Sequence, residues 1–300
     1  MYYSPLRYPG GKGKLAAFME YMIEQLGYRG GTYIEPFAGG AGIAVELLLR
    51  DVVKEIVIND YDKGVWSFWK AILTETDRFI EEIRKAPLTM EEWNKQHEIC
   101  LNNNNKYSFS LGFATFFMNR TNRSGIIKGG VIGGNNQSGK WKMDARFNKE
   151  ELIRRIKNIA EKKSNIKLYN KDITTFITKY VSHYRQNTLV YLDPPYFKKG
   201  EQLYMNFFQL KDHTRIEKNI KEHIECDWII TYDKALEIER LYAQYPMYLY
   251  DLNYSVASKR KASELMILKE GMNLPSNDEL KKHKIDINIR AFEPQQKSEE

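Results

Sequence analysis

Short apolar runs that end near Gly, Asn or Asp alternate with amphipathic stretches over most of this chain, and this alternation restricts the possible folds more than any other feature. Such runs predict strands, and the stretches between them predict helices. A repeated strand–helix order favours an α/β fold with a mostly parallel sheet and helices on both faces. The sequence predicts strands at residues 32–37, 55–59, 166–169, 189–192, 228–231 and 265–268, and helices at residues 43–49, 151–160 and 210–224.

Residues 75–143 break this alternation, because helical patterns follow one another there without a strand between them and lead into a Gly- and Asn-rich stretch. Connections in compact domains are usually short. We therefore expect residues 75–143 to form an inserted, largely helical domain, and residues 1–74 and 144–270 to form the sheet domain. Residues 271–300 are expected to be a polar C-terminal tail with a frayed end.

Charge and cysteine usage restrict the class of protein only weakly. The formal net charge of +7 favours a polyanionic partner. Cys100 and Cys226 have no metal-ligand spacing and the five histidines are scattered, so we expect reduced thiols and no metal site. The N-terminus lacks a signal-peptide pattern, and no apolar run is long enough to span a bilayer. These features predict a cytoplasmic protein that does not enter membranes.

A Gly-rich turn, Pro36-Phe37-Ala38-Gly39-Gly40, separates the first predicted strand from an apolar helix. Glycines let a ligand approach the backbone, and the start of a helix offers unpaired N–H groups. Asp60 stands at the end of the next strand, where a carboxylate can hold the hydroxyls of a ribose. Both features fit any nucleoside-containing cofactor, although the run Gly-Gly-Ala-Gly does not match the G-x-G-x-x-G of NAD-binding proteins. A plain tight turn, with Asp60 as a helix N-cap, is the alternative.

The most specific motif is Asp193-Pro194-Pro195-Tyr196, which ends an apolar run. The two prolines stiffen the turn at the carboxyl end of a strand, where ligands bind in open α/β sheets. Adenine N6 is a poor nucleophile because its lone pair is delocalised into the ring. The Asp193 carboxylate and the Pro194 carbonyl can accept its two N–H groups and free that lone pair, a catalysis by positioning and electrostatics. Tyr196 offers a flat face for stacking a flipped-out base. An ordinary proline turn is the alternative.

Together these motifs resemble the Dam-type family of adenine-N6 DNA methyltransferases, in the family's motif order from about Ser4 to Leu268. The resemblance implies a Rossmann-like, mostly parallel, seven-stranded methyltransferase sheet with an inserted target-recognition domain. It implies S-adenosylmethionine as the cofactor and double-stranded DNA as the partner, with site-specific methylation of a flipped-out adenine. It leaves open whether the enzyme acts beside a cognate restriction endonuclease or as an orphan.

The resemblance also implies the residues that bind the cofactor. The segment Arg-Tyr-Pro-Gly-Gly-Lys resembles the family's N-terminal cofactor motif, with Tyr8 and Lys12 against the methionine end and Arg7 toward the DNA. Asp172 resembles the acid that binds the cofactor's adenine amino group, although by itself it reads as a helix N-cap. The full set implied at the cofactor is Tyr8, Lys12, Glu35, Pro36, Phe37, Gly39, Gly40, Asp60, Asp172 and Asp193.

Residues 117–125 resemble the family's recognition segment, in which an Asn-Arg pair ends a helix and leads into a hairpin. Arg and Asn side chains suit bidentate contacts with guanine and adenine edges. The hairpin here is Gly-rich, unlike that of GATC-specific members, so the target sequence stays open. A solvated basic face is the alternative for any single lysine. The DNA contacts implied are Arg7, Asn119, Arg120, Asn122, Arg123, Lys128 and Lys142, with Lys259, Arg260 and Lys261 in a later basic hairpin.

Three other functions remain possible from the sequence. A cytosine-N4 methyltransferase uses the same amine chemistry but more often has Ser before the two prolines. An RNA or protein-glutamine methyltransferase typically has Asn there. A non-catalytic DNA-binding module that keeps the fold would not require Asp193.

Overall fold

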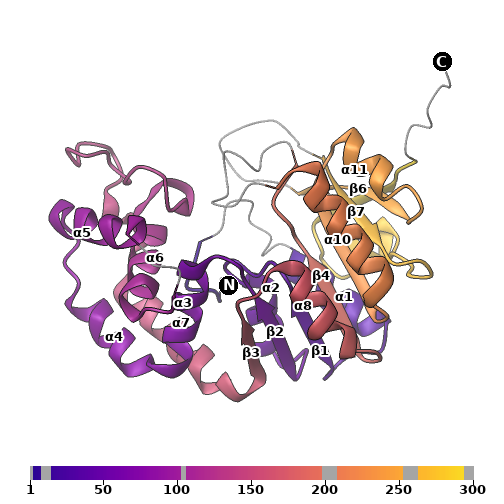
Figure 1. The fold of residues 1–300 in the computed structure, drawn as a ribbon, viewed down its shortest axis with the longest axis horizontal. Coiled ribbons are helices and arrows are strands. Elements are labelled where there is room, and N and C mark those ends of the chain that lie inside the picture. Colours follow the sequence, from indigo (N-terminus) through magenta and orange to yellow (C-terminus); the bar gives the residue numbers. More distant parts are fainter. Residues whose placement is uncertain (1–2, 8–14, 103–105, 198–207, 253–262, 294–300) are drawn as a thin grey trace.

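A mixed eight-stranded sheet forms the centre of the computed structural model, which describes residues 3–7, 15–102, 106–197, 208–252 and 263–293 (Figure 1). The strand order is β3-β2-β1-β4-β5-β7-β6-β8. The strands are β1 (Thr32–Glu35), β2 (Glu55–Asn59), β3 (Ile166–Tyr169), β4 (Thr188–Leu192), β5 (Asp227–Asp233), β6 (Met247–Leu252), β7 (Ser263–Leu268) and β8 (Ile287–Ala291).

The first five strands in this order are parallel, and the last three are paired antiparallel. The carboxyl ends of β3, β2, β1, β4 and β5 therefore lie at one edge of the sheet. The α/β architecture predicted from the strand–helix alternation is confirmed, with a mixed sheet where a mostly parallel one was predicted, and all six predicted strands are present.

Helices cover both faces of the sheet, because its central strands are apolar on both sides. Within β1, Tyr33 packs into the core on one face and Ile34 into the core on the other. The first face carries α1 (Leu15–Gln25), α2 (Gly42–Leu49), α7 (Lys149–Glu161) and α12 (Asn277–Lys282). The second carries α8 (Ile173–Lys179), α10 (Leu210–His223) and α11 (Leu236–Leu241).

A group of helices extends from the β3 side of the sheet (Figure 1). It contains α3 (Lys63–Thr74), α4 (Thr76–Lys85), α5 (Met90–Leu101) and α6 (Phe109–Thr121). The rings of Phe68 and Phe116 stack with centroids 5.8 Å apart. A Cβ atom added at Gly112 would lie 2.6 Å from the Ser67 carbonyl oxygen, so α6 lies directly against α3. Helices α4, α5 and α6 lie within residues 75–143, and the interpretation of this segment as an inserted, largely helical domain stays a prediction.

Side-chain caps fix where several helices begin. Asp62 accepts the Val65 N–H at the start of α3, and Asn148 accepts the Glu151 N–H at the start of α7. Such caps satisfy backbone donors that have no partner within the helix. Short 3₁₀ turns complete the connections, at η2 (Arg123–Gly125), η3 (Met143–Arg146), η4 (Lys163–Asn165) and η5 (Val181–His183).

The prediction of seven strands is wrong, because the segment expected to be a polar tail supplies α12 and the eighth strand, β8. Ile287 and Ile289 are buried and alternate with exposed polar residues, so the half-buried pattern is short and easily missed. The Asn277 side chain exchanges hydrogen bonds with the backbone of Ile289, at 2.8 and 2.9 Å. The sequence analysis assigned no strand to β6 or β8.

Candidate active site

Four functional segments that are far apart in the sequence meet at the carboxyl edge of the sheet. Asp172 follows β3, Asp60 follows β2, the Gly-rich turn follows β1, and Asp193 follows β4. Because these strands are parallel neighbours in that order, the four segments form a row.

The Gly-rich turn is held in a conformation that suits a close approach of backbone to ligand. Gly39 has a φ of 47° and Ala41 a φ of 44°, both in the left-handed region that glycine adopts without strain. The Gly39 N–H donates to the Asp60 carboxylate at 2.8 Å, and the Gly39 carbonyl accepts from the Trp69 indole at 2.9 Å. The turn is therefore braced by β2 and α3.

The Asp60 carboxyl group also accepts the Asp62 N–H at 2.9 Å. Burial of the carboxyl, reinforced by the charge of Asp62, raises the pKa of Asp60 to about 7, against the lowering effect of the hydrogen bonds from Asp62 and Gly39. Asp62, and not Asp60, caps the helix that follows. The alternative of Asp60 as a plain N-cap is therefore wrong.

Glu35 lies beneath the turn. Its buried carboxyl accepts the Ala44 N–H at 3.0 Å and so secures the first turn of α2. Burial raises the pKa of Glu35 to about 8; the charge of Asp193 adds to this, and the hydrogen bond from Ala44 opposes it. The carboxyl therefore supports the turn from within the protein. The predicted contact between Glu35 and the cofactor stays a prediction.

Asn59, which the sequence analysis did not single out, joins three segments of the site. Its side-chain N–H groups donate to the carbonyls of Pro36 and Lys171, at 3.0 and 3.1 Å, and its side-chain oxygen accepts the Lys171 N–H at 2.9 Å. The amide is buried at the end of β2. In the sequence, Asn59 is recognisable only as a polar residue that ends an apolar strand. Its role depends on contacts with the segments after β1 and β3, which the sequence alone does not show.

Asp172 caps α8, where its carboxylate accepts the Thr175 N–H at 3.1 Å. Burial acts to raise the pKa of Asp172, but hydrogen bonds from Thr175 and Thr174 outweigh it and hold the pKa below its usual value. The helix-cap interpretation is confirmed, and the carboxylate is exposed at the sheet edge. Its contact with the adenine of a cofactor stays a prediction.

Asp193 is oriented by the neighbouring strand β5. The Thr231 hydroxyl donates to one Asp193 carboxylate oxygen at 3.0 Å, and the Tyr191 hydroxyl lies 2.8 Å from the same Thr231 oxygen. Pro194 is buried and Pro195 is half-buried. The carboxylate is thus oriented by β5 at the carboxyl end of β4, and its catalytic role stays a prediction.

Tyr196 is anchored from its hydroxyl end. The side chain is 6% exposed, and its hydroxyl donates to the Glu264 carboxylate at 2.8 Å. The Tyr250 hydroxyl donates to the other oxygen of Glu264. The next residue, Phe197, donates its N–H to Asp233 at 2.8 Å. Sequence analysis missed Glu264 and Asp233, whose signal was an acid within or at the end of an apolar strand.

The N-terminal segment connects the Gly-rich turn to α6. The Ser4 hydroxyl donates to the Gly40 carbonyl. The Arg7 N–H donates to the Asn119 side-chain oxygen at 2.7 Å, and the Asn119 amide donates to the carbonyls of Arg7 and Gly125, at 2.6 and 2.9 Å. Tyr8 and Lys12 lie outside the described residues, so their predicted cofactor contacts stay predictions.

The structure contradicts the predicted DNA contacts of Asn119 and Asn122. Asn119 is 3% exposed, and its amide is engaged by the backbone as above. Asn122 is fully buried, accepts from the Trp93 indole at 2.8 Å, and donates to the carbonyls of Ile126 and Ile127. Both amides hold the backbone of the turn after α6 from inside. The predicted hairpin there has a single antiparallel bridge, Asn122 to Val131.

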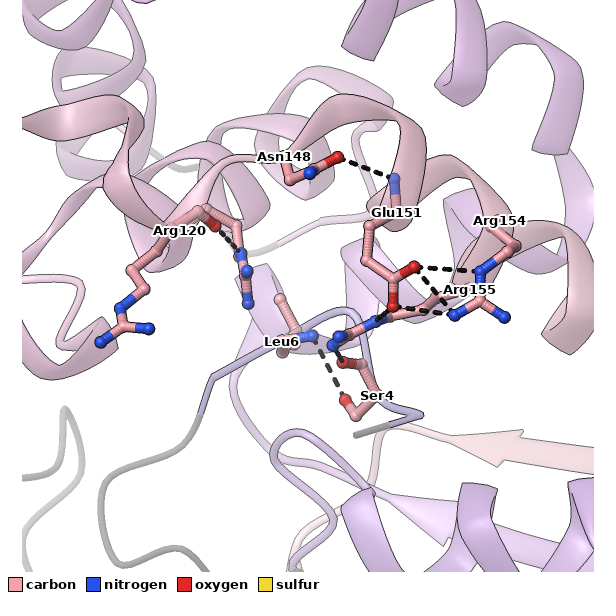
Figure 2. Close-up of polar contacts among 8 residues, drawn as sticks. Ser4, Leu6, Arg120, Asn148, Glu151, Arg154 and Arg155 are labelled. Atoms are coloured by element: carbon pink, nitrogen blue, oxygen red, sulfur yellow. Dashed lines mark hydrogen bonds and ion pairs between the residues drawn. The ribbon is translucent and has the colours of Figure 1, made fainter. Parts of the chain in front are cut away.

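A cluster of arginines lies where α6 meets the start of α7. The Arg120 Nε donates to the Arg146 carbonyl at 2.7 Å, and Arg155 donates to Glu151 and to the Ser4 carbonyl (Figure 2). Burial lowers the pKa of Arg120 to about 9, and the charges of Arg7, Arg155 and Arg146 lower it further. Burial, with Arg146, also lowers the pKa of Arg7. A concentration of positive charge this close favours an anion beside it.

Apart from Arg7 and Arg120 in the arginine cluster, the remaining predicted DNA contacts divide into two groups. Arg123, Lys128 and Lys142 are exposed on the Gly-rich segment, so they are available to an external partner. Lys259, Arg260 and Lys261 lie outside the described residues. All of these contacts stay predictions.

Comparison with known proteins identifies the family. The model of the D12 class of N6 adenine-specific DNA methyltransferases matches residues 8–256. This chain belongs to that class. The family recognised from the sequence motifs is confirmed, and S-adenosylmethionine is the cofactor that goes with this methyltransferase class.

One curated relative of the D12 chain is the type II methyltransferase M.MjaIII of Methanocaldococcus jannaschii, 27% identical over 204 residues, which are 64% of this chain and 68% of the relative. Among solved structures, a SAM-dependent methyltransferase from Agrobacterium tumefaciens aligns with a TM-score of 0.40 at 11% identity, over 86% of this chain and 62% of that one. The rRNA methyltransferase aviRa from Streptomyces viridochromogenes aligns with a TM-score of 0.32 at 10% identity, over 84% and 83%.

Among the described residues of this chain, no group of His, Cys, Asp and Glu side chains could hold a metal ion. Within the same residues, no helix is both long and apolar enough to cross a membrane.

Proposed function

We propose that this chain transfers a methyl group from S-adenosylmethionine to N6 of an adenine that is flipped out of a DNA duplex. The observation that carries the proposal is the position of Asp193. Its carboxylate is oriented by Thr231 and stands in one row with the Gly-rich turn and Asp60. A cofactor held along that row has its substituent end next to Asp193.

The residues present fit S-adenosylmethionine. Asp60 offers a carboxylate at the height of a ribose, the left-handed turn at Gly39 lets the amino-acid end approach without meeting a side chain, and Asp172 is exposed at the adenine end. The row runs β3, β2, β1, β4, so the order adenine, ribose, amino acid, acceptor follows the order of the strands. When bound, the cofactor supplies a sulfonium methyl group that a nucleophilic nitrogen can accept.

The protein's own groups prepare the acceptor. Asp193 accepts one hydrogen of the exocyclic amine, and the Pro194 carbonyl accepts the other, so the nitrogen lone pair is released from the ring. The hydrogen bond from Thr231 fixes the carboxylate before the substrate arrives, which avoids reorganisation during the reaction. Asp193 can be a weak base, because an amine that has gained a methyl group loses its proton readily.

DNA is held on the side of α6 and the Gly-rich segment. Exposed Arg123, Lys128 and Lys142 and the arginine cluster around Arg120 favour phosphate contacts, which fix register but carry no sequence information. Residues 75–143 are proposed to be the target-recognition domain. The type II relative supports, by analogy only, a cognate restriction endonuclease as partner.

The test is identification of the methylated base. The protein is incubated with tritium-labelled S-adenosylmethionine and unmethylated duplex DNA, and the DNA is digested to nucleosides. Label in N6-methyl-2′-deoxyadenosine supports the proposal. Label in N4-methyl-2′-deoxycytidine, or no label in the DNA, contradicts it.

A further inference from the structure

We propose that Glu264 is a positioning residue for methyl transfer, which fixes the catalytic loop through the hydroxyl of Tyr196. The inference rests on the proposed function. Glu264 lies on β7, two strands from the strand that carries Asp193, and does not itself reach the reacting atoms. Its effect on the reaction passes through Tyr196, which is three residues after Asp193.

Two paired acids hold the end of the catalytic loop. Asp233 on β5 and Glu264 on β7 are directly opposite each other in the antiparallel register, and both are buried. Asp233 accepts the backbone N–H of Phe197, and Glu264 accepts the hydroxyl of Tyr196. Consecutive residues of the loop are therefore bound by cross-strand partners.

The beginning of the loop is held from the same strand. Thr231 precedes Asp233 by two residues, so both side chains lie on the same face of β5. Thr231 donates to Asp193, whereas Asp233 and Glu264 hold the residues that follow the two prolines. The loop is thus fixed at both ends, and the stiff Pro194-Pro195 pair spans the distance between them.

The chemistry of Glu264 suits this role. A buried carboxyl group costs free energy unless it is hydrogen-bonded, and here two tyrosine hydroxyls, of Tyr196 and Tyr250, satisfy it. Hydrogen bonds to an ionised carboxylate are shorter and stronger than neutral ones. A stiff backbone joins Pro194 to Tyr196. The hydrogen bond of the Tyr196 hydroxyl to Glu264 therefore fixes both the Tyr196 ring and the Pro194 carbonyl.

Four variants test the inference in the full-length protein: Glu264→Ala, Glu264→Gln, Tyr196→Phe and the control Tyr250→Phe. The control removes a second donor to the same carboxylate, from Tyr250 on β6. We measure kcat and KM with a duplex substrate, the dissociation constant for the cofactor, and the melting temperature.

We expect Glu264→Ala to lower kcat by about 10–100-fold through misplacement of the loop, with cofactor affinity within about twofold of wild type. Glu264→Gln should recover most of the activity, because its amide oxygen still accepts a hydrogen bond. Tyr250→Phe should lower kcat by less than about threefold. In the double variant Glu264→Ala with Tyr196→Phe, the two losses should not multiply, because both break one interaction.

The outcomes separate the inference from the proposed function. A wild-type protein that does not methylate adenine overturns both. A wild-type protein that does, with Glu264→Ala at normal kcat, overturns the inference alone. The inference is also overturned if the two losses of kcat multiply in the double variant, or if Tyr250→Phe lowers kcat as much as Tyr196→Phe does. If Glu264→Ala does not fold, Tyr196→Phe decides, because it breaks the same hydrogen bond from the other side: a normal kcat in that variant overturns the inference.

Discussion

Asp193 is the residue on which the chemistry depends most directly, and its environment suggests how to separate a catalytic role from a structural one. Its carboxylate is held by Thr231, whereas the cofactor turn is braced by Asp60, Asn59 and Trp69. Removing the carboxylate should therefore leave the cofactor site intact.

We expect Asp193→Ala to lower kcat by on the order of 10²–10³-fold or more, because it removes a preorganised group from the transition state. Cofactor affinity, measured by calorimetry, should stay near that of wild type. Asp193→Asn is the matched control, since it keeps the size and one acceptor oxygen. Loss of cofactor binding in both variants would show that Asp193 is a structural acid.

Asp60 predicts a pH dependence of cofactor binding. Its pKa of about 7 in the folded protein means that the carboxyl is largely neutral at pH 6 and ionised at pH 8. The ionised form accepts hydrogen bonds from both ribose hydroxyls. Affinity should therefore rise by about tenfold from pH 6 to pH 8 in the wild type. Asp60→Asn should bind more weakly and lack this rise; subtracting its pH profile removes titration of the cofactor and of Glu35.

The same group has the opposite effect on stability. Its folded pKa lies above its value of about 3.9 in an unfolded chain, so the native state binds more protons between those values and loses stability as the pH rises from about 4 to 7. Asp60→Asn should therefore raise the melting temperature more at pH 8 than at pH 5. An equal change at both pH values would show that the carboxyl titrates normally.

At the scale of elements, the N-terminal segment and α6 are joined through one amide. Asn119→Ala would leave the Arg7 N–H and the carbonyls of Arg7 and Gly125 without their partner. Each unsatisfied buried group costs about 1–3 kcal/mol, so urea denaturation should show a clear loss of stability. Arg123→Ala is the control on the same segment. Because the Arg123 side chain is exposed, the Arg123→Ala protein should keep its stability and bind DNA less tightly than the wild type.

The opposite result would restore the original prediction for Asn119. If Asn119→Ala kept its stability and selectively lost DNA affinity, the amide would contact DNA and its hydrogen bonds to Arg7 would be incidental. A protein that loses both DNA and cofactor binding together with stability fits the role as a connector between segments.

These elements show what the sequence could and could not predict. The central parallel strands were predictable because both their faces are buried and they read as continuous apolar runs. The acids after them were predictable because ligands bind at carboxyl ends. Asn119 was misassigned because an amide suits a base edge and a backbone peptide equally well. Asn59 and Glu264 were missed because their partners lie on other strands, which only the assembled sheet brings near.

At the scale of the whole molecule, the active-site edge and the antiparallel end of the sheet are separate regions. The row from Asp172 to Asp193 belongs to β3, β2, β1 and β4, whereas β7, β6 and β8 lie at the other end. The hydrogen bond from Tyr196 to Glu264 on β7 links the catalytic loop to that end, and buried side chains of both regions share one core cluster. Damage at the far edge should therefore change stability more than chemistry.

A chain that ends at Pro275 tests this separation, because it lacks α12 and β8. It would expose the hydrogen-bonding edge of β6 and remove the buried side chains of Leu280, Ile287 and Ile289, each worth about 1.5–3 kcal/mol of burial. We expect a lower melting temperature and aggregation that increases with concentration, while the soluble fraction keeps its kcat at low temperature. A chain that ends at Glu293 keeps β8 and should match the full-length protein. If the shorter chain melted normally, β8 would be an accessory strand; if it folded but lost kcat, the far edge would be coupled to the catalytic loop through β6 and β7.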